Sequence, residues 1–439
     1  MIGLMIALGA AAPIAAADVL PPLRTADGEP VCAVYFFPHW WEPWKSSDEE
    51  ILRDLALLRS WGINTLLIDH EWSQAIDGNF ALLDRSHRLA KQAGMQIAPW
   101  LSLKTWSDMA SSDDRRRLVR EMYGVELSWS ETQEGQQAGL LPYDEATIAA
   151  GVAYTEQYLE RYLQDGALAR FLRDGKACPA VALTVELAWP EGGFDERTNA
   201  RFRDWCRARY ATVERLNQAW GTALADFAAV EPTDTAVFDF PDLVAGTAAH
   251  PAAGEDHVQF RSELVNEGLA EQKRRLLAKY PDLLIVTELP YQAGAEHPHA
   301  IGYRIGYAAN PVTADHADVV VLRLTGPLTP AEQEVQARWI RESGKQFILC
   351  YRTYSDWGAL EAQIEPLGEA CASLVAAFGH GIGFYSWNEM VDVHLAEWRP
   401  GAPDNQMTVR GEVAARMQRQ AEAITRHYRE AVARLPQSR

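Results

Sequence analysis

Carboxylates and aromatic rings stand directly after several short apolar runs of this sequence. The clearest run is Pro179-Ala-Val-Ala-Leu-Thr-Val-Glu-Leu-Ala-Trp-Pro190, in which the single carboxylate, Glu186, comes where a buried strand is expected to end. Burying a carboxylate without a partner costs free energy, so Glu186 needs either an ion-pair partner or a chemical role. Glu288 and Glu389 stand in comparable positions after two later runs.

Two carboxylates that face one ligand can cleave a glycosidic bond. One carboxylic acid protonates the leaving oxygen, and the other carboxylate attacks the anomeric carbon or activates a water molecule. We therefore expect Glu186 to be the proton donor and either Glu389 or Glu288 to be the second catalytic carboxylate. The plainer alternative makes Glu186 a buried ion-pair partner of an arginine and lets the other two hold substrate hydroxyls or orient neighbours.

The elements that must position these acids alternate regularly along the chain. Short β-branched or apolar runs are each followed by a segment with helical periodicity, which is typical of βα units in a parallel sheet. Eight such runs predict a (β/α)8 TIM barrel. The expected strands are Val31 to Pro38, Thr65 to Asp69, Gln96 to Leu101, Ala180 to Glu186, Leu283 to Glu288, Val319 to Leu324, Gln346 to Tyr351 and Ile382 to Trp387.

Two connections, 102–179 and 187–282, are too long for a simple crossover and predict long helical insertions after strands three and four. Within the second, helices are expected over 195–210 and 212–220, and a loop over 245–254. Ser47-x-x-Glu50 is a capping-box pattern that begins a helix after strand one, and Gly62 is expected just beyond its end. A last amphipathic helix is expected over 410–434 and would close the barrel.

In such a barrel the site lies at the carboxyl ends of the strands, so the polar and aromatic residues that end each run are the candidates for binding substrate. Flat rings stack on sugar faces, and charged or amide groups hydrogen-bond sugar hydroxyls. Asp69 and Glu71 could instead form a structural network with Arg352. The expected substrate-binding residues are His39, Trp40, Trp41, Asp69, Glu71, Trp72, Trp100, Trp189, Tyr291, Arg323, Tyr351, Arg352, Trp387 and Asn388.

Net charge and missing motifs disfavour nucleic-acid-binding, membrane-binding, metal-binding and cofactor-binding proteins. The formal net charge of -19 disfavours nucleic acid and anionic membranes as partners. The five cysteines show no C-x-x-C spacing, and His70-Glu71 lacks the second histidine of H-E-x-x-H, so we expect no metal. Phosphate-binding glycine loops are absent from the sequence, so we expect no cofactor. A G-x-S-x-G elbow is also absent, which removes the commonest alternative class of hydrolase. A carbohydrate is the expected partner.

The first residues are apolar and small, and Ala15-Ala16-Ala17 before Asp18 fits a signal-peptide cleavage pattern. We therefore expect residues 1–17 to be a signal peptide, residues 18–439 to form a single barrel domain, and the mature protein to be periplasmic or secreted with no membrane segment. Neither the oligomeric state nor the sugar is indicated by the sequence.

One segment resembles a known family. Phe202-Arg-Asp-Trp-Cys-Arg-Ala-Arg-Tyr210, followed by Leu216-Asn-Gln-Ala-Trp-Gly-Thr222, is similar to the segment after the acid/base glutamate in family 42 glycoside hydrolases, the beta-galactosidase-like members of clan A. The resemblance covers roughly Ala180 to Glu288 and implies a TIM-barrel glycosidase with Glu186 as acid/base. Val185 stands where that family normally has asparagine.

The resemblance breaks at strand seven. The family's nucleophile should fall near Cys350, but Gln346-Phe-Ile-Leu-Cys-Tyr-Arg-Thr-Tyr354 contains no acid. Three hypotheses follow: a diverged hydrolase whose second carboxylate lies on another strand, an inverting or substrate-assisted hydrolase, or a catalytically silent carbohydrate-binding barrel. The separation of the carboxyl groups distinguishes the first two, at roughly 5 Å for retaining and roughly 6.5–9.5 Å for inverting chemistry.

Overall fold

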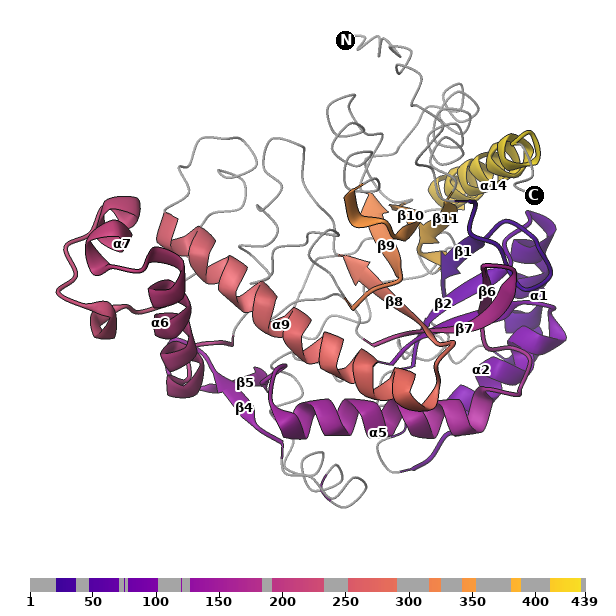
Figure 1. The fold of residues 1–439 in the computed structure, drawn as a ribbon. Coiled ribbons are helices and arrows are strands. Elements are labelled where there is room, and N and C mark those ends of the chain that lie inside the picture. The colour runs from indigo at the N-terminus through magenta and orange to yellow at the C-terminus, as the bar shows by residue number, and fades with distance from the viewer. Residues whose placement is uncertain are drawn as a thin grey trace, which may run out of the picture.

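Eight parallel strands close into a barrel, and a ninth strand of the same sheet lies outside the ring (Figure 1). The structure is a computed structural model that describes residues 21–36, 47–70, 75, 78–101, 120, 127–183, 192–232, 252–289, 316–324, 342–352, 380–387 and 411–435. The ring contains β1 (Cys32–Tyr35), β2 (Thr65–Asp69), β3 (Gln96–Trp100), β7 (Lys176–Ala182), β8 (Leu284–Leu289), β9 (Val319–Leu324), β10 (Gln346–Arg352) and β11 (Gly381–Tyr385).

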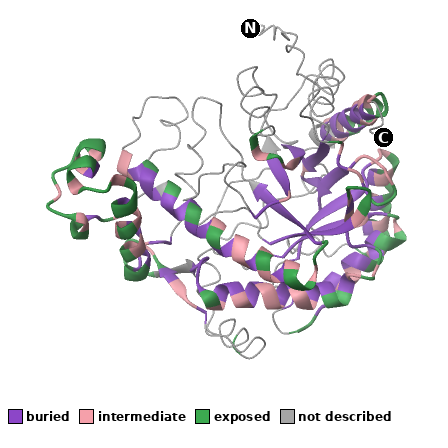
Figure 2. Ribbon diagram, viewed as in Figure 1, coloured by how far each residue is buried: buried purple, intermediate pink, exposed green. Residues whose placement is uncertain are grey.

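Pairing of β3 with β7 closes the ring, and there the Leu101 N–H donates to the Ala182 carbonyl oxygen at 2.7 Å. The predicted (β/α)8 barrel is therefore confirmed. Its strands are rich in branched apolar residues because both faces of each strand are covered, by the other strands inside and by helices outside. Figure 2 shows the strands as almost continuously buried.

A short antiparallel hairpin precedes the fourth barrel strand. β6 (Arg170–Arg173) pairs with the start of β7, and the two residues Asp174 and Gly175 join them. Both have positive φ, 51° and 76°, which a two-residue hairpin turn requires and which Asp-Gly pairs favour. As a result β7 begins at Lys176, earlier than the predicted Ala180.

The first βα unit follows its sequence signals closely. α1 (Asp48–Ser60) begins at the N-cap residue Ser47, whose Oγ accepts from the Glu50 N–H at 3.2 Å while the Ser47 N–H donates to Glu50 Oε2 at 2.7 Å. This is the predicted capping box. Gly62 follows the C-cap residue with φ of 95°, a value that favours glycine. α2 (Ala81–Gln92) then packs beside α1.

Both predicted insertions carry secondary structure of their own. Between β3 and β7 lie β4 (Trp129–Glu131), β5 (Gln137–Leu140) and α5 (Glu145–Tyr162); between β7 and β8 lie α6 (Glu196–Tyr210), α7 (Val213–Trp220), the 3-10 helix η3 (Phe227–Ala229) and α9 (Ala252–Lys279). α6 and α7 match the predicted helices. The predicted loop over 245–254 is wrong at its end, because α9 already begins at Ala252. Figure 1 shows α9 running from α6 and α7 back to β8.

The last helix, α14 (Gly411–Ala433), also agrees with its prediction and covers the strand that completes the ring. Tyr428 donates its hydroxyl to the carbonyl oxygen of His380, the residue before β11. Arg429 donates to the Gly62 carbonyl oxygen at 3.2 Å, so α14 is tied to both the last and the first βα units.

Four cysteines of the described residues are buried: Cys32, Cys178, Cys206 and Cys350. Cys32 and Cys350 lie inside strands, where a thiol packs as a small apolar side chain. Burial raises the pKa of the Cys32 thiol to about 12, which keeps it in the unreactive thiol form. No helix in the described part of the chain is long and apolar enough to cross a membrane.

α9 packs so closely against the start of α5 that only glycine fits at one position. A Cβ at Gly268 would lie 1.9 Å from the carbonyl oxygen of Pro142. We expect Gly268→Ala to lower the free energy of unfolding by roughly 1–3 kcal/mol, because backbone must move to admit the methyl group. This loss should exceed the gain of up to about 1 kcal/mol that alanine brings to a helix interior.

Gly151→Ala is the matched control for this prediction. Its Cβ would lie 2.4 Å from Oε1 of Gln272, the far end of a flexible side chain that can turn away, so we expect a much smaller change. Thermal unfolding of the two variants beside the unmodified chain measures both effects. Equal losses of stability in the two variants would contradict the backbone contact.

Candidate active site

One face of every barrel strand lines a buried interior cluster. Its members are Ala33 and Tyr35 of β1, Leu67 of β2, Ala98 and Trp100 of β3, Cys178, Ala180 and Ala182 of β7, Leu284 and Val286 of β8, Val319 and Val321 of β9, and Ile348 and Cys350 of β10. Successive residues of a strand point to opposite faces. Asp69 therefore shares the interior face with Leu67, and Glu288 shares it with Leu284 and Val286.

Three aromatic rings gather at the carboxyl ends of neighbouring strands within this interior. Tyr35 stacks on Trp100 with ring centroids 5.8 Å apart and planes at 12°, and it contacts Tyr385 of β11 at 4.9 Å. Trp100 is fully buried, and its indole N–H has no hydrogen-bond partner among the described residues. The stacked rings of Tyr35 and Trp100 and the tilted ring of Tyr385 form an aromatic surface in the barrel interior, on the face of the strands that also carries Asp69 and Glu288.

Asp69 and Glu288 are both almost completely buried, at 3% and 1% exposure. Asp69 is paired in register with Trp100, so the β2 carboxylate and the β3 indole end their strands at the same level. Glu288 is one residue from the end of β8 and lies level with Val321 of β9. Acids and rings at the carboxyl ends of parallel strands provide the groups that bind and cleave sugars.

Two expected substrate-binding residues do not face this interior. Tyr351 follows the interior residue Cys350, so strand alternation turns it outward, and it lies in the core between sheet and helices. Trp387 lies in the same outer core: its indole N–H donates to Asp54 Oδ2 of α1 at 3.1 Å, and its ring meets Trp61 edge-on. Burial raises the pKa of Asp54. These contacts fix α1 to the barrel and do not favour sugar binding by either ring.

The remaining expected residues are less fully placed. The backbone of Arg323 lies in β9 beside Cys350, and that of Arg352 lies in β10 beside Tyr385, while their side chains are outside the described part. The other candidates also lie outside the described residues: His39, Trp40, Trp41, Glu71, Trp72, Glu186, Trp189, Tyr291, Asn388 and Glu389.

Sequence reasoning missed Tyr35 and Tyr385. Both lie inside the predicted runs 31–38 and 382–387, whereas the prediction considers the residues that end each run. The signal was available, because alternation from Ala33 leads to Tyr35 and alternation from Gly383 leads to Tyr385. Within the described residues, no cluster of three or more histidine, cysteine or acidic side chains could hold a metal ion.

Comparison with known proteins gives a family and a fold. The model of a glycoside hydrolase family, family 42, described as beta-galactosidase, matches residues 155–391, more than half of the chain. No curated protein matches the chain significantly in sequence.

Solved structures of glycosidases share the fold at low sequence identity. A family 42 beta-galactosidase of G. stearothermophilus aligns with a TM-score of 0.58 and 12% identity over 92% of this chain and 57% of its own. A beta-galactosidase of the Antarctic haloarchaeon Halorubrum lacusprofundi has a TM-score of 0.54 and 16% identity over 93% of this chain and 58% of its own.

The catalytic domain of a beta-amylase of Paenibacillus polymyxa also aligns, with a TM-score of 0.54 and 13% identity over 81% of this chain and 91% of that domain. This chain therefore spans just over half the length of the two galactosidases and nearly the whole of the amylase domain. At these identities the likeness shows a common barrel fold.

Proposed function

The chain belongs to glycoside hydrolase family 42, and from this premise we propose that it cleaves a beta-galactoside or a related glycan by carboxylate acid/base chemistry. The observation that carries the proposal is the interior face at the carboxyl ends of the strands, where Asp69 and Glu288 lie with the stacked rings of Tyr35 and Trp100. Acids and rings in that position suit a pyranose ring and its hydroxyls.

We assign the proton donor to Glu186. The family resemblance supports this assignment, because Glu186 falls where the family has its acid/base glutamate. In this role the carboxylic acid gives its proton to the leaving oxygen as the glycosidic bond breaks, and a second carboxylate attacks the anomeric carbon or deprotonates water.

Glu288 is the stronger candidate for the second carboxylate, and Glu389 is the other. Glu288 is buried on the interior face of β8, where a carboxylate can approach a sugar bound against the rings. Comparing the turnover of Glu288→Gln with that of Glu389→Gln identifies which of the two is needed.

A specific observation favours a second candidate function, a catalytically silent carbohydrate-binding barrel. The strand that carries the nucleophile in the family corresponds to β10, and Gln346-Phe-Ile-Leu-Cys-Tyr-Arg352 has no acidic side chain. A barrel that has lost its second carboxylate would keep the aromatic surface and bind sugar without hydrolysing it.

A panel of aryl glycosides tests these two functions. We expect hydrolysis of a beta-galactoside or a closely related glycoside, and NMR of the first-formed anomer distinguishes retention from inversion. Isothermal titration with the matching oligosaccharides measures binding in parallel. Binding without hydrolysis of aryl or natural glycans would replace the hydrolase with the silent barrel, and the absence of both would reject both functions.

We also propose that the apolar N-terminal segment, residues 1–17, directs export. Its support is the small-residue pattern before Asp18. Expression in a bacterial host followed by mass spectrometry of the N-terminus tests the proposal, because cleavage would leave Asp18 as the first residue of the periplasmic protein. An intact N-terminus in the cytoplasmic fraction would contradict it.

A further inference from the structure

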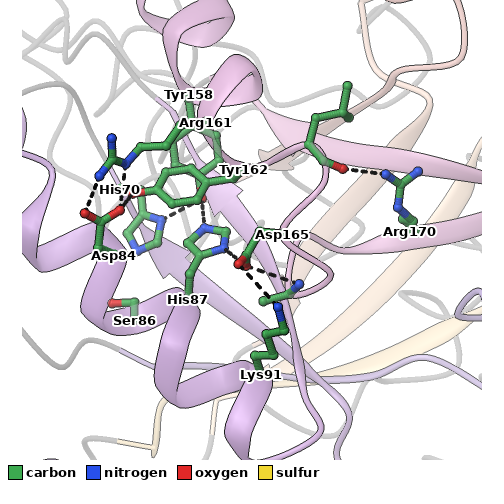
Figure 3. Close-up of polar contacts among 12 residues, drawn as sticks. His70, Asp84, Ser86, His87, Lys91, Tyr158, Arg161, Tyr162, Asp165 and Arg170 are labelled. Carbon is green, nitrogen blue, oxygen red and sulfur yellow. Dashed lines mark hydrogen bonds and ion pairs between the residues drawn. The ribbon is translucent and has the colours of Figure 1, made fainter.

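Four polar side chains form a continuous chain of hydrogen bonds behind the end of β2 (Figure 3). His70, the residue after that strand, contacts the Tyr158 hydroxyl through Nδ1 at 2.9 Å. The same hydroxyl lies 2.6 Å from Nε2 of His87, and Nδ1 of His87 lies 3.0 Å from Oδ1 of Asp165. The first three residues are fully buried or nearly so, whereas the Asp165 side chain is 26% exposed.

The direction of every hydrogen bond in this chain is determined by its acidic end. A carboxylate only accepts, so neutral His87 must donate from Nδ1 to Asp165 and keep a lone pair on Nε2. The Tyr158 hydroxyl has one proton and must give it to that lone pair. Its oxygen then accepts from Nδ1 of His70, which leaves Nε2 of a neutral His70 as an acceptor.

The surroundings of His87 favour its neutral form at neutral pH. Burial lowers the pKa of His87, while the hydrogen bond and charge of Asp165 partly oppose this effect. The ring of Tyr162 stacks on His87 at 3.8 Å, and its hydroxyl donates to Asp84 at 2.7 Å.

Further charges face the ends of the chain. Asp84 is also held by two guanidinium nitrogens of Arg161, Nε and Nη2, and Lys91 lies 3.9 Å from Asp165. The charges of Asp165 and Asp84 both act to raise the pKa of His87, but burial outweighs them and the net shift is downward. The Tyr158 hydroxyl stays protonated because burial raises its pKa well above the usual value.

Residue 70 is also fixed through its backbone. Its N–H donates to the Trp100 carbonyl oxygen at 3.1 Å, and its carbonyl oxygen accepts from the Tyr154 hydroxyl. Tyr154 and Tyr158 lie one turn apart on α5, so one face of this helix holds both the backbone and the ring of His70. Fixing the backbone of His70 also fixes the preceding residue, Asp69, whose side chain lies on the interior face.

We propose that His70 is a positioning residue of the barrel mouth whose tautomer is set from the protein surface by Asp165, through His87 and Tyr158. This inference rests on the proposed function in one respect: it assumes that sugar binds at this mouth of the barrel. The chain holds the end of β2, and with it Asp69, in one orientation, and it makes Nε2 of His70 an acceptor.

The same chain can transfer charge from His70 to His87. When Nε2 of His70 gains a proton, the Nδ1 proton moves to the Tyr158 oxygen and the Tyr158 proton moves to Nε2 of His87. One proton has been gained, His70 is again neutral but now carries its proton on Nε2, and the positive charge rests on His87 beside Asp165. Acidification therefore converts Nε2 of His70 from an acceptor into a donor.

NMR of the full-length protein labelled with 15N-histidine tests this proposal. We expect His70, assigned by comparison with His70→Gln, to carry its proton on Nδ1 at high pH and on Nε2 once His87 is charged. In Tyr158→Phe the two rings should titrate independently, and His70 should lose its preference for the Nδ1 tautomer. A His70 that carries the Nε2 proton at every pH would overturn the proposal.

Tyr162→Phe is the matched control, because it removes a hydroxyl from the same ring stack that bonds to Asp84 and not to the relay. It should keep the unmodified tautomers. Asp165→Asn, at the surface, should fold normally and lower the pH of the tautomer change by roughly one unit, since the charge that supports the cation is gone. A Tyr162→Phe spectrum that matches Tyr158→Phe, or no shift in Asp165→Asn, would overturn the relay.

Activity provides a separate measurement. If the chain hydrolyses an aryl glycoside, Tyr158→Phe should displace the acid limb of the kcat/KM profile and lower kcat more than it raises KM, and Tyr162→Phe should do neither. Unchanged profiles in Tyr158→Phe would remove the positioning role. Because the NMR results need no turnover, a failed glycosidase assay rejects the proposed function alone and leaves the relay to be decided by the spectra.

Discussion

Replacing Glu186 with glutamine should lower the turnover of an unactivated glycoside by roughly 10²- to 10⁴-fold, the range that a general acid supplies. Glutamine keeps the size and hydrogen-bonding capacity of the side chain but has no proton to give to the leaving oxygen. Sugar binding, measured by isothermal titration, should change little, because stacking and hydroxyl contacts are retained. Aryl glycosides with acidic leaving groups need less protonation, so their turnover should fall less.

The control for this variant is Glu196→Gln, which makes the same change on an exposed side chain in the first turn of α6. Glu196 forms an ion pair with Arg203 at the surface and has no proposed role at the strand ends. Loss of this carboxylate should therefore leave the kinetics unchanged. Glu186→Gln with full activity would remove Glu186 from catalysis. A fall that is equal for all leaving groups would show that the residue does not act as the proton donor.

The barrel could be predicted from the sequence because its signals are local. Strand limits at Thr65–Asp69 and Val319–Leu324 agree with prediction, as does the capping box of α1, since each depends on residues within one turn or one run. The β6–β7 hairpin was missed although Asp174-Gly175 signals it, because the expected strand began after the turn. The early start of α9 was missed because the segment before it is rich in small residues.

The site was predicted less completely, because the position of a residue at the end of a strand does not determine whether its side chain faces the barrel interior or the outer helices. Asp69, Trp100 and Glu288 lie on interior faces, but Tyr351 and Trp387 turn outward into the core against the helices. Within β10 the two-residue period joins Cys350 to Ile348 on the interior face and puts Tyr351 on the opposite face.

The relay behind β2 could not be found from sequence at all. His70 and Tyr158 are 88 residues apart, and His87 and Tyr158 are 71 apart, so no window of local pattern contains both partners. Their meeting depends on α5, part of the insertion after strand three, lying across the outside of β2. The insertion therefore supports the barrel mouth from behind, which a simple βα unit at this place would not do.

Two buried histidines should make the fold sensitive to acid. Burial lowers the pKa of His380 and that of His316 to about 3. In the unfolded chain both titrate near 6.5, so between about pH 6.5 and pH 3 the unfolded state binds more protons than the folded state. The free energy of unfolding must then fall as pH falls through this window, by about 2 kcal/mol per histidine at pH 5 relative to neutral pH.

His380→Asn should remove about half of this acid-induced fall in the free energy of unfolding, and it should keep the hydrogen bond that His380 makes. Nδ1 of His380 accepts a hydrogen bond from the Phe347 N–H at 3.0 Å. If Nδ1 were protonated, this hydrogen bond would be lost, because both groups would then be donors. The asparagine oxygen accepts in the same place and does not titrate. Thermal unfolding at pH 7.5 and pH 5 measures the difference, with His427→Asn on α14 as control, because that side chain is only half-buried. If His380→Asn loses as much stability on acidification as the unmodified chain, the buried neutral histidine is not the cause.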